Sequence, residues 1–207
     1  MAPRAIIFDL LTALLDSWTL WAQAANDLTA AYQWRRRYLE LTFGCGIYRP
    51  YEELVYEAAR DVHLPDRVPE TLLRDWDQLR PWPEAPAVLS ELKDRGYQLG
   101  VVTNCSVALG RRAVAVCAGG VEFDAVVTAE EAGFYKPHGK TYAAILEALG
   151  VDASEALFVA GSNGDVVGAA AAGMDVVWHN RVGLSALEGS APGREGRSLQ
   201  VVMEYLE

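Results

Sequence analysis

The sequence has few cysteines, few basic residues and no long apolar run. Its three cysteines, Cys45, Cys105 and Cys117, show no CxxC spacing, which fits free thiols in a reducing compartment. The 18 Lys and Arg residues are outnumbered by 28 Asp and Glu, giving a formal net charge of −10. This balance argues against nucleic-acid binding, which normally needs a basic patch. No segment reaches the ~18 apolar residues of a membrane span.

We expect no signal peptide in the N-terminal residues, because Asp9 interrupts the apolar run of the segment MAPRAIIFDLL. We therefore expect a cytoplasmic protein without membrane association. Hydrophobic residues make up 51% of the chain, which is enough for a sizeable core. A length of 207 residues suits one domain, or one domain with a smaller insert. An anionic small molecule can still be the substrate, because the local field of a site can oppose the net charge.

Strand and helix patterns alternate along most of the chain. Short apolar runs predict strands at residues 5–8, 98–103, 125–128, 157–160 and 175–178. Helices, most of them ended by glycine, are predicted at residues 84–95, 107–117, 140–149 and 164–172. This alternation predicts an α/β fold, a Rossmann-like three-layer core with a parallel sheet. The segment 188–198 is rich in Gly, Ser and Pro, and we expect a flexible loop there.

An all-helical stretch interrupts the alternation after the first strand. Apolar side chains between Trp18 and Tyr32 recur at three- and four-residue steps, as one face of a helix requires. Further helices are predicted at residues 34–41, 51–62 and 70–79. A cluster of prolines ends this stretch. We expect residues 15–80 to form a helical cap domain, inserted into a core domain of residues 1–14 and 81–207.

Polar residues follow several of the predicted strands. Asp9 ends the first, Thr103 and Asn104 end the second, and the segment 162–165 follows the fourth. In open parallel sheets, ligands bind at the carboxyl ends of the strands. We therefore expect these side chains to surround one site, with Lys136 reaching it from a loop.

Four segments, in order, resemble the motifs of the haloacid dehalogenase superfamily. They are residues 8–17 around Asp9, residues 101–104, Lys136 and Pro137 with Tyr142, and residues 162–169. The resemblance implies an α/β core with an inserted cap. It also implies that Asp9 is the nucleophile and that Lys136 and Asp165 are catalytic.

Two positions indicate which chemistry of this superfamily applies. Its phosphatases resemble one another in having a second aspartate where this chain has Leu11, and a metal-binding acid where it has Gly161. A hard cation requires several oxygen ligands, so ordinary phosphate ester hydrolysis is disfavoured. The L-2-haloacid dehalogenases carry an apolar or aromatic residue at the first position and use no metal. We expect no cofactor and no metal site.

The resemblance implies a two-step reaction on a small carboxylic acid. The Asp9 carboxylate attacks C2 and displaces the leaving group, and water then cleaves the aspartyl ester. Lys136 would keep Asp9 ionised, and Asp165 would position the water. Arg35 would receive the halide, although Arg36 and Arg37 remain alternatives. The substrate-binding residues implied are Leu10, Leu11, Arg35, Thr103, Asn104, Tyr142, Ser162 and Asn163.

The first motif departs from the dehalogenase pattern Asp-x-Tyr-Gly-Thr. Here the segment reads Asp9-Leu10-Leu11-Thr12-Ala13, which leaves the substrate open. The alternatives are a phosphatase with degenerate motifs and a non-catalytic binding protein. The partner expected from the sequence is a small-molecule carboxylic acid, and the aromatic content of the cap is compatible with a homodimer.

Overall fold

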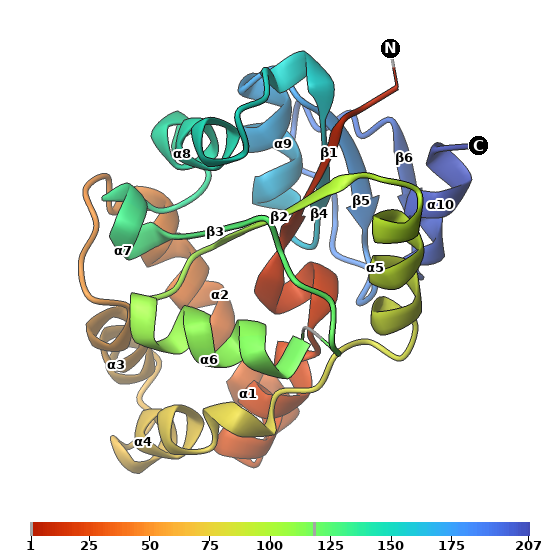
Figure 1. Ribbon diagram of the computed structural model, residues 1–207. Coiled ribbons are helices and arrows are strands. Elements are labelled where there is room, and N and C mark those ends of the chain that lie inside the picture. Colours follow the sequence, from red (N-terminus) through yellow and green to blue (C-terminus); the bar gives the residue numbers. More distant parts are fainter. Residues whose placement is uncertain (1, 118) are drawn as a thin grey trace.

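The computed structural model describes residues 2–117 and 119–207, with a six-stranded parallel sheet at its centre (Figure 1). The strands are β1 (Ala5–Asp9), β2 (Gln98–Thr103), β3 (Ala125–Thr128), β4 (Ala156–Ala160), β5 (Asp175–His179) and β6 (Arg194–Gly196). Their order is β3-β2-β1-β4-β5-β6, and all neighbours run parallel. The first strand, β1, therefore lies between β2 and β4 inside the sheet, and Asp9 is its last residue.

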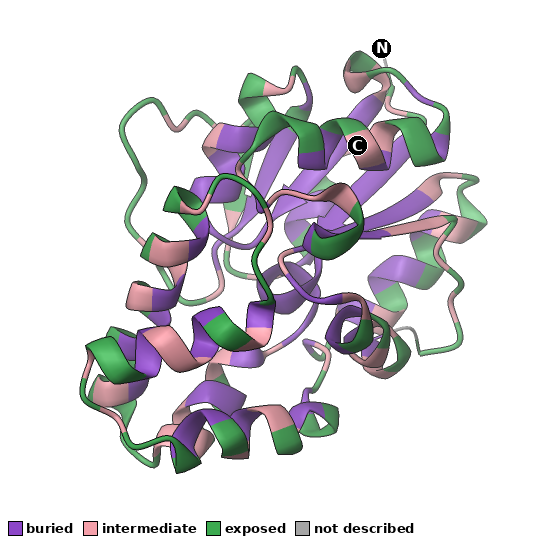
Figure 2. Ribbon diagram, turned by 90° about the vertical axis from the view of Figure 1, so that its left-hand side faces the viewer, coloured by how far each residue is buried: buried purple, intermediate pink, exposed green. Residues whose placement is uncertain are grey.

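Helices cover both faces of the sheet. They are α5 (Ala85–Asp94), α6 (Val107–Cys117), α7 (Ala129–Ala132), α8 (Gly139–Leu149), α9 (Asn163–Ala171) and α10 (Gln200–Tyr205). Ile7 packs with α8 and α9, whereas Ile6 and Phe8 pack with α5, α6 and α10. This division follows from the alternation of side chains along a strand. Figure 2 shows the buried strands enclosed by helices with exposed outer faces. The predicted three-layer α/β fold is confirmed.

A second group of helices lies beyond the carboxyl ends of the strands (Figure 1). It comprises α1 (Ser17–Ala25), α2 (Leu28–Gly44), α3 (Tyr51–Asp61), α4 (Arg67–Arg74) and the 3₁₀ turn η2 (Trp76–Gln78). Its two connections to the sheet run side by side, because Leu15 bridges Pro81 and the Asp16 N–H donates to the Arg80 carbonyl at 2.8 Å. These paired connections support the proposed division between cap and core. We call this group the cap from here on.

The helix break near the start of the cap lies earlier than the sequence pattern indicates. The pattern runs from Trp18 to Tyr32 without interruption, but α1 ends at Ala25 and α2 begins at Leu28. Asn26 takes the left-handed conformation, with φ of 52°, which ends α1. The Asp27 carboxylate then accepts the Ala30 N–H at 2.8 Å and caps α2. The apolar spacing of three and four residues continues across Asn26 and Asp27, so periodicity alone did not show the break.

The expectation of a loop throughout residues 188–198 is wrong, because β6 lies within that segment. Gly193 N–H donates to the Val176 carbonyl at 2.7 Å, and Asn180 N–H donates to the Gly196 carbonyl at 2.8 Å. The strand is short and largely exposed, so it needs no apolar run that the sequence would show. Within the described part of the chain, no helix combines the length and hydropathy required to cross a membrane.

Candidate active site

Asp9 is the last residue of β1 and caps a single π-helical turn, η1 (Leu10–Leu14). Its Oδ2 accepts hydrogen bonds from Thr12 N at 2.9 Å, Thr12 Oγ1 at 2.5 Å and Ala13 N at 3.2 Å. The Asp9 residue is 6% exposed. Three donors on one oxygen stabilise the ionised form and fix its orientation.

Lys136 lies between two buried carboxylates. Its Nζ is 2.7 Å from Asp9 Oδ1 and 3.0 Å from Asp165 Oδ2. Lys136 comes from the segment between α7 and α8, and Asp165 lies in the first turn of α9. The Tyr142 hydroxyl donates to Asp165 Oδ1 at 3.1 Å. The residues expected to be catalytic are therefore in direct contact, and Tyr142 contacts the site through Asp165.

The two carboxylates differ in pKa. Burial raises the pKa of Asp9, but the charge of Lys136 and the hydrogen bonds from Thr12 outweigh it, so the pKa lies below its usual value. Burial also raises the pKa of Asp165, and there Lys136 does not compensate for burial and the nearby Asp9 charge. Burial lowers the pKa of Lys136, but the opposite effect of the two carboxylates is larger, so the pKa of Lys136 lies above its usual value. The arrangement fits an ionised nucleophile beside a carboxylate suited to proton transfer.

Asn104 and Ser162 hold this charged group in place. Asn104 Oδ1 accepts from Lys136 N at 2.7 Å, and its Nδ2 donates to the Lys136 carbonyl at 3.1 Å. Ser162 Oγ accepts from Asp165 N at 3.3 Å and caps α9. Both side chains therefore support Lys136 and Asp165 directly.

Arg35 is the arginine of the cap that turns inward. It lies on α2 and is 5% exposed. Its guanidinium carbon lies 4.0 Å from the ring centroid of Trp18, and Nη2 donates to Ser17 Oγ at 2.8 Å. Burial lowers the pKa of Arg35 to about 10, so the side chain is charged at neutral pH. Among the described residues, Nη1 has no hydrogen-bond partner.

The neighbouring arginines face away from this site. Arg36 lies 3.6 Å from Glu40, and Arg37 lies 2.7 Å from Asp61, both at the protein surface. Of the three arginines in this run, Arg35 alone lies beside the carboxylates.

A cavity of about 40 Å³ lies between the cap and the carboxyl end of the sheet. This is enough for roughly three water-sized groups. Its lining comprises Asp9, Leu11, Thr12, Trp18, Arg35, Tyr38, Leu39, Phe43, Asn104, Lys136, Ser162, Asp165 and Leu184. We call it the catalytic cavity. Seven of the residues expected from the sequence therefore line one space.

Four expected binding residues do not line the catalytic cavity, and one of them, Tyr142, contacts the site only through Asp165. Leu10 is fully buried in the apolar core. Thr103 is also buried, and its hydroxyl donates to Cys105 Sγ at 3.4 Å. Asn163 points toward a neighbouring loop, where Nδ2 donates to the Ser185 carbonyl at 2.9 Å. Being adjacent to a strand end places a residue near the site, but the direction of its side chain depends on the local turn.

The structure adds residues that the sequence did not indicate. Thr12 is the most direct, because its hydroxyl contacts the Asp9 carboxylate. An N-cap aspartate typically accepts the N–H of the residue three positions later. The spacing from Asp9 to Thr12 was therefore the available signal. Phe43 and Leu184 come from a helix end and a loop that are distant in sequence, so no motif connects them to Asp9.

Comparison with known proteins agrees with this arrangement. The family described as haloacid dehalogenase-like hydrolase matches residues 6–179. The chain belongs to this family. An (S)-2-haloacid dehalogenase of Pseudomonas sp. strain YL is 29% identical over 99% of this chain and 94% of its own length. A solved L-2-haloacid dehalogenase has a TM-score of 0.90 and 26% identity, covering 100% of this chain and 99% of that chain.

Phosphatases also occur among the relatives. A phosphatase of Mycobacterium tuberculosis is 33% identical over 65% of this chain and 64% of its own length. The choice between the two chemistries therefore depends on the residues of the site itself.

The catalytic cavity does not fit a magnesium ion. A Cβ atom on Gly161 would overlap Thr12 Oγ1 and Ala13 N, so the place of a metal-binding acid is filled by the η1 turn. The carboxylates that line the cavity, Asp9 and Asp165, are both paired with Lys136. Mg²⁺ needs near-octahedral oxygen coordination, and a lysine ammonium between the two acids opposes it.

Two aromatic side chains, Trp82 and His179, donate hydrogen bonds to the backbone carbonyls of the η1 turn that contains Thr12. Trp82 Nε1 donates to the Thr12 carbonyl at 3.0 Å, and His179 Nδ1 donates to the Ala13 carbonyl at 2.8 Å. Burial lowers the pKa of His179, so the ring is neutral at pH 7. The bond to the Thr12 carbonyl fixes the peptide unit that carries the Ala13 N–H, which donates to Asp9, and the bond to the Ala13 carbonyl fixes the next peptide unit of the turn.

Proposed function

We propose that the protein hydrolyses the carbon–halogen bond at C2 of small 2-haloacids, through an ester on Asp9 and without a metal. The observation that carries this proposal is the partly unpaired guanidinium of Arg35, in the same small cavity as the ionised Asp9. A leaving halide requires an anion-binding group but no proton donor. The similarity to (S)-2-haloacid dehalogenases over almost the whole chain supports the same function.

In the first step, an oxygen of the Asp9 carboxylate attacks C2 of the acid. The C2–halogen bond breaks, and the halide leaves with the bonding electron pair toward Arg35. Lys136 and the donors of the η1 turn keep Asp9 ionised and oriented. Leu11, where phosphatases carry a second acid, leaves no side chain to protonate a leaving group, and a halide requires none.

In the second step, water attacks the carbonyl carbon of the aspartyl ester. Asp165 accepts the proton of this water, since its raised pKa makes it a better base than an ordinary aspartate. Charge develops on the ester carbonyl oxygen, which the amides of Thr12 and Ala13 can stabilise. The bond between the Asp9 carbonyl carbon and the ester oxygen then breaks, and the oxygen of the attacking water completes the restored Asp9 carboxylate. The 2-hydroxyacid leaves with the former Asp9 oxygen on C2, protonated by the proton that Asp165 accepted. The net products are the 2-hydroxyacid, the halide and one proton.

Halide release tests this function directly. The purified protein is incubated with 2-chloropropionate in the presence of EDTA, and chloride is measured by ion chromatography. We expect release that is unaffected by EDTA and absent in Asp9→Asn. If no short 2-haloacid releases halide, the dehalogenase proposal is wrong.

The same preparation tests the two alternatives. A phosphatase would turn over a phosphate monoester only when Mg²⁺ is added. A non-catalytic binding protein would bind carboxylic acids equally well with Asp9 or with Asn at that position, and would release no halide. The packing around Gly161 disfavours a phosphatase. The ion pairs of Lys136 with Asp9 and Asp165 favour a reactive site over a non-catalytic binding site.

A further inference from the structure

A second cavity, of about 240 Å³, adjoins the catalytic cavity. The two share four lining residues, Trp18, Leu39, Phe43 and Leu184. The shared side chains are apolar or aromatic, so the boundary between the cavities is apolar, and we call this boundary the constriction. We call the larger space the outer cavity.

The cap side of the constriction is formed by Phe43, at the C-terminal end of α2. Its ring lies against the first turn of α9, where a Cβ atom on Gly164 would be 2.5 Å from Phe43 Cζ. The absence of a side chain at Gly164 therefore allows the Phe43 ring to lie beside Ser162 and Asp165. This contact connects the cap with the core at the edge of the site.

The core side of the constriction is formed by Leu184, in the loop after β5. The loop is held by the buried amide of Asn180, whose Oδ1 accepts from Leu184 N at 2.7 Å and whose Nδ2 donates to the Leu184 carbonyl at 2.9 Å. Asn163 contributes a further bond to the Ser185 carbonyl. The position of Leu184 is therefore fixed by its own hydrogen bonds.

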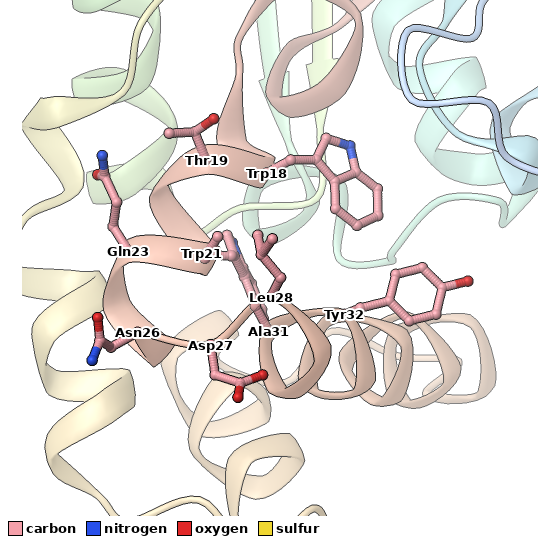
Figure 3. A pocket seen from close by; sticks show the side chains of 10 residues that line it. Trp18, Thr19, Trp21, Gln23, Asn26, Asp27, Leu28, Ala31 and Tyr32 are labelled. Atoms are coloured by element: carbon pink, nitrogen blue, oxygen red, sulfur yellow. The ribbon is translucent and has the colours of Figure 1, made fainter.

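The remaining walls of the outer cavity combine two aromatic side chains, Trp18 and Tyr32, with Leu39 and three polar residues, Arg36, Glu40 and Asn163. Trp18 of α1 and Tyr32 of α2 are stacked, with ring centroids 6.5 Å apart. Figure 3 shows both side chains projecting on the same side of an open groove that also contains Leu28. Trp18 and Tyr32 line the outer cavity as well as this groove, so they separate the two. The charged side chains at the outer cavity, Arg36 and Glu40, are paired with each other.

The catalytic cavity is too small for a whole 2-haloacid with a substituent. It takes roughly three water-sized groups, and the halogen and carboxylate already require that space. With the halogen at Arg35 and C2 at Asp9, the C2 substituent must extend beyond the cavity. The adjoining space with apolar walls is the outer cavity.

We propose that the outer cavity binds the C2 substituent of the substrate, and that Phe43 and Leu184 determine how long that substituent can be. This inference rests on the proposed function for the identity of the reaction. The substrates it assigns are 2-haloacids with an unbranched apolar chain of about four carbons on C2. The substituent passes between Phe43 and Leu184 and contacts Trp18 and Tyr32.

The test compares a short and a long acid in both binding and turnover. Calorimetry measures the affinity for propionate and hexanoate, which carry no halogen, and halide release measures kcat/KM for 2-bromopropionate and 2-bromohexanoate. The variants are Leu184→Trp and Phe43→Trp, which narrow the constriction, and Gly164→Ala, which pushes the Phe43 ring aside. Leu28→Trp is the matched control, because Leu28 is 79% exposed in the separate groove.

We expect the wild type to bind hexanoate at least about tenfold more tightly than propionate, since each buried methylene adds affinity. Leu184→Trp and Phe43→Trp should lower the preference for the long acid over the short acid about tenfold, both in affinity and in kcat/KM. Gly164→Ala should raise this preference, and Leu28→Trp should leave it unchanged. Equal affinity of the wild type for both acids, or an unchanged ratio in both narrowing variants, overturns the inference. The binding measurement needs no halogen, so it tests the outer cavity even if the protein releases no halide. Absence of halide release would contradict the proposed function but not the inference about the outer cavity.

Discussion

Gly161 lies directly against Thr12, so that a side chain at residue 161 would overlap the Thr12 hydroxyl and the Ala13 amide. The same hydroxyl and amide donate to the Asp9 carboxylate. The glycine therefore gives the η1 turn the space in which it holds the Asp9 carboxylate. One position thus accounts for both the ordered carboxylate and the poor fit for a metal.

Replacing Gly161 with Asp tests this packing. We expect Gly161→Asp to lower the free energy of unfolding by about 1–3 kcal/mol through overpacking, and to remove activity without creating Mg²⁺-dependent phosphatase activity. The measurements are urea denaturation and turnover of p-nitrophenyl phosphate with and without Mg²⁺. Gly139→Asp is the control, because a side chain there meets no atom within 4 Å. A stable Gly161→Asp protein with Mg²⁺-dependent turnover would contradict the account.

Replacing Arg35 tests the halide-binding role. We expect Arg35→Gln to lower kcat for halide release about 10²–10³-fold, the usual cost of removing one group that stabilises developing charge. Arg37→Gln should leave activity unchanged, because Arg37 pairs with Asp61 at the surface. Pre-steady-state halide release shows whether the first step is slowed. Equal activity of the two variants would remove Arg35 from the mechanism.

Replacing Lys136 tests the buried ion pairs. Lys136→Met leaves two buried carboxylates without a counter-charge, and we expect a loss of about 3–5 kcal/mol in the free energy of unfolding at pH 7. Without Lys136, burial raises the pKa values of Asp9 and Asp165 in the folded variant. The variant therefore loses stability as pH rises through these pKa values and regains it toward acid pH. The deficit should therefore shrink between pH 7 and pH 4, whereas the exposed Lys140→Met control shows little loss at either pH. A constant deficit would mean that the loss is one of packing.

The two steps should differ in their pH dependence. Asp9 must be ionised to attack, and its lowered pKa preserves ester formation to low pH. Asp165 must be ionised to accept the proton of water, so hydrolysis is lost as pH falls through its pKa, which lies above the usual 3.8. We expect a window at acid pH in which the first halide is released rapidly and later turnovers are slow. Rapid-quench halide measurements from pH 4 to 7 show this, and loss of both phases at the same pH would count against it.

The sequence was sufficient for five of the six strands of the sheet and for the two carboxylates proposed to be catalytic. Asp9 follows a buried strand, Asp165 lies in the first turn of a helix, and strand ends meet at one edge of a parallel sheet. These relations depend on the order of elements, which hydrophobic patterns report well. The position of Lys136 required the family resemblance, because a loop lysine has no pattern of its own.

The finer features could not be predicted because they depend on tertiary contacts. The π-helical turn after Asp9 is set by its packing against Gly161, Trp82 and His179. The inward direction of Arg35 depends on how the cap docks on the core, since three consecutive arginines are equivalent in the sequence. The constriction between Phe43 and Leu184 joins a helix end to a loop, and neither position carries a periodic signal.

The ester on Asp9 is the central claim, and mass spectrometry of the trapped protein tests it most directly. Asp165→Asn, which removes the base of the second step, is mixed with 2-chloropropionate, quenched in acid and digested. We expect the peptide containing Asp9 to gain the mass of the acid minus its halogen, with one halide released per modified protein. Rapid halide release by the wild type with an unmodified Asp9 peptide in this variant, or a modification at any other residue, would contradict the account.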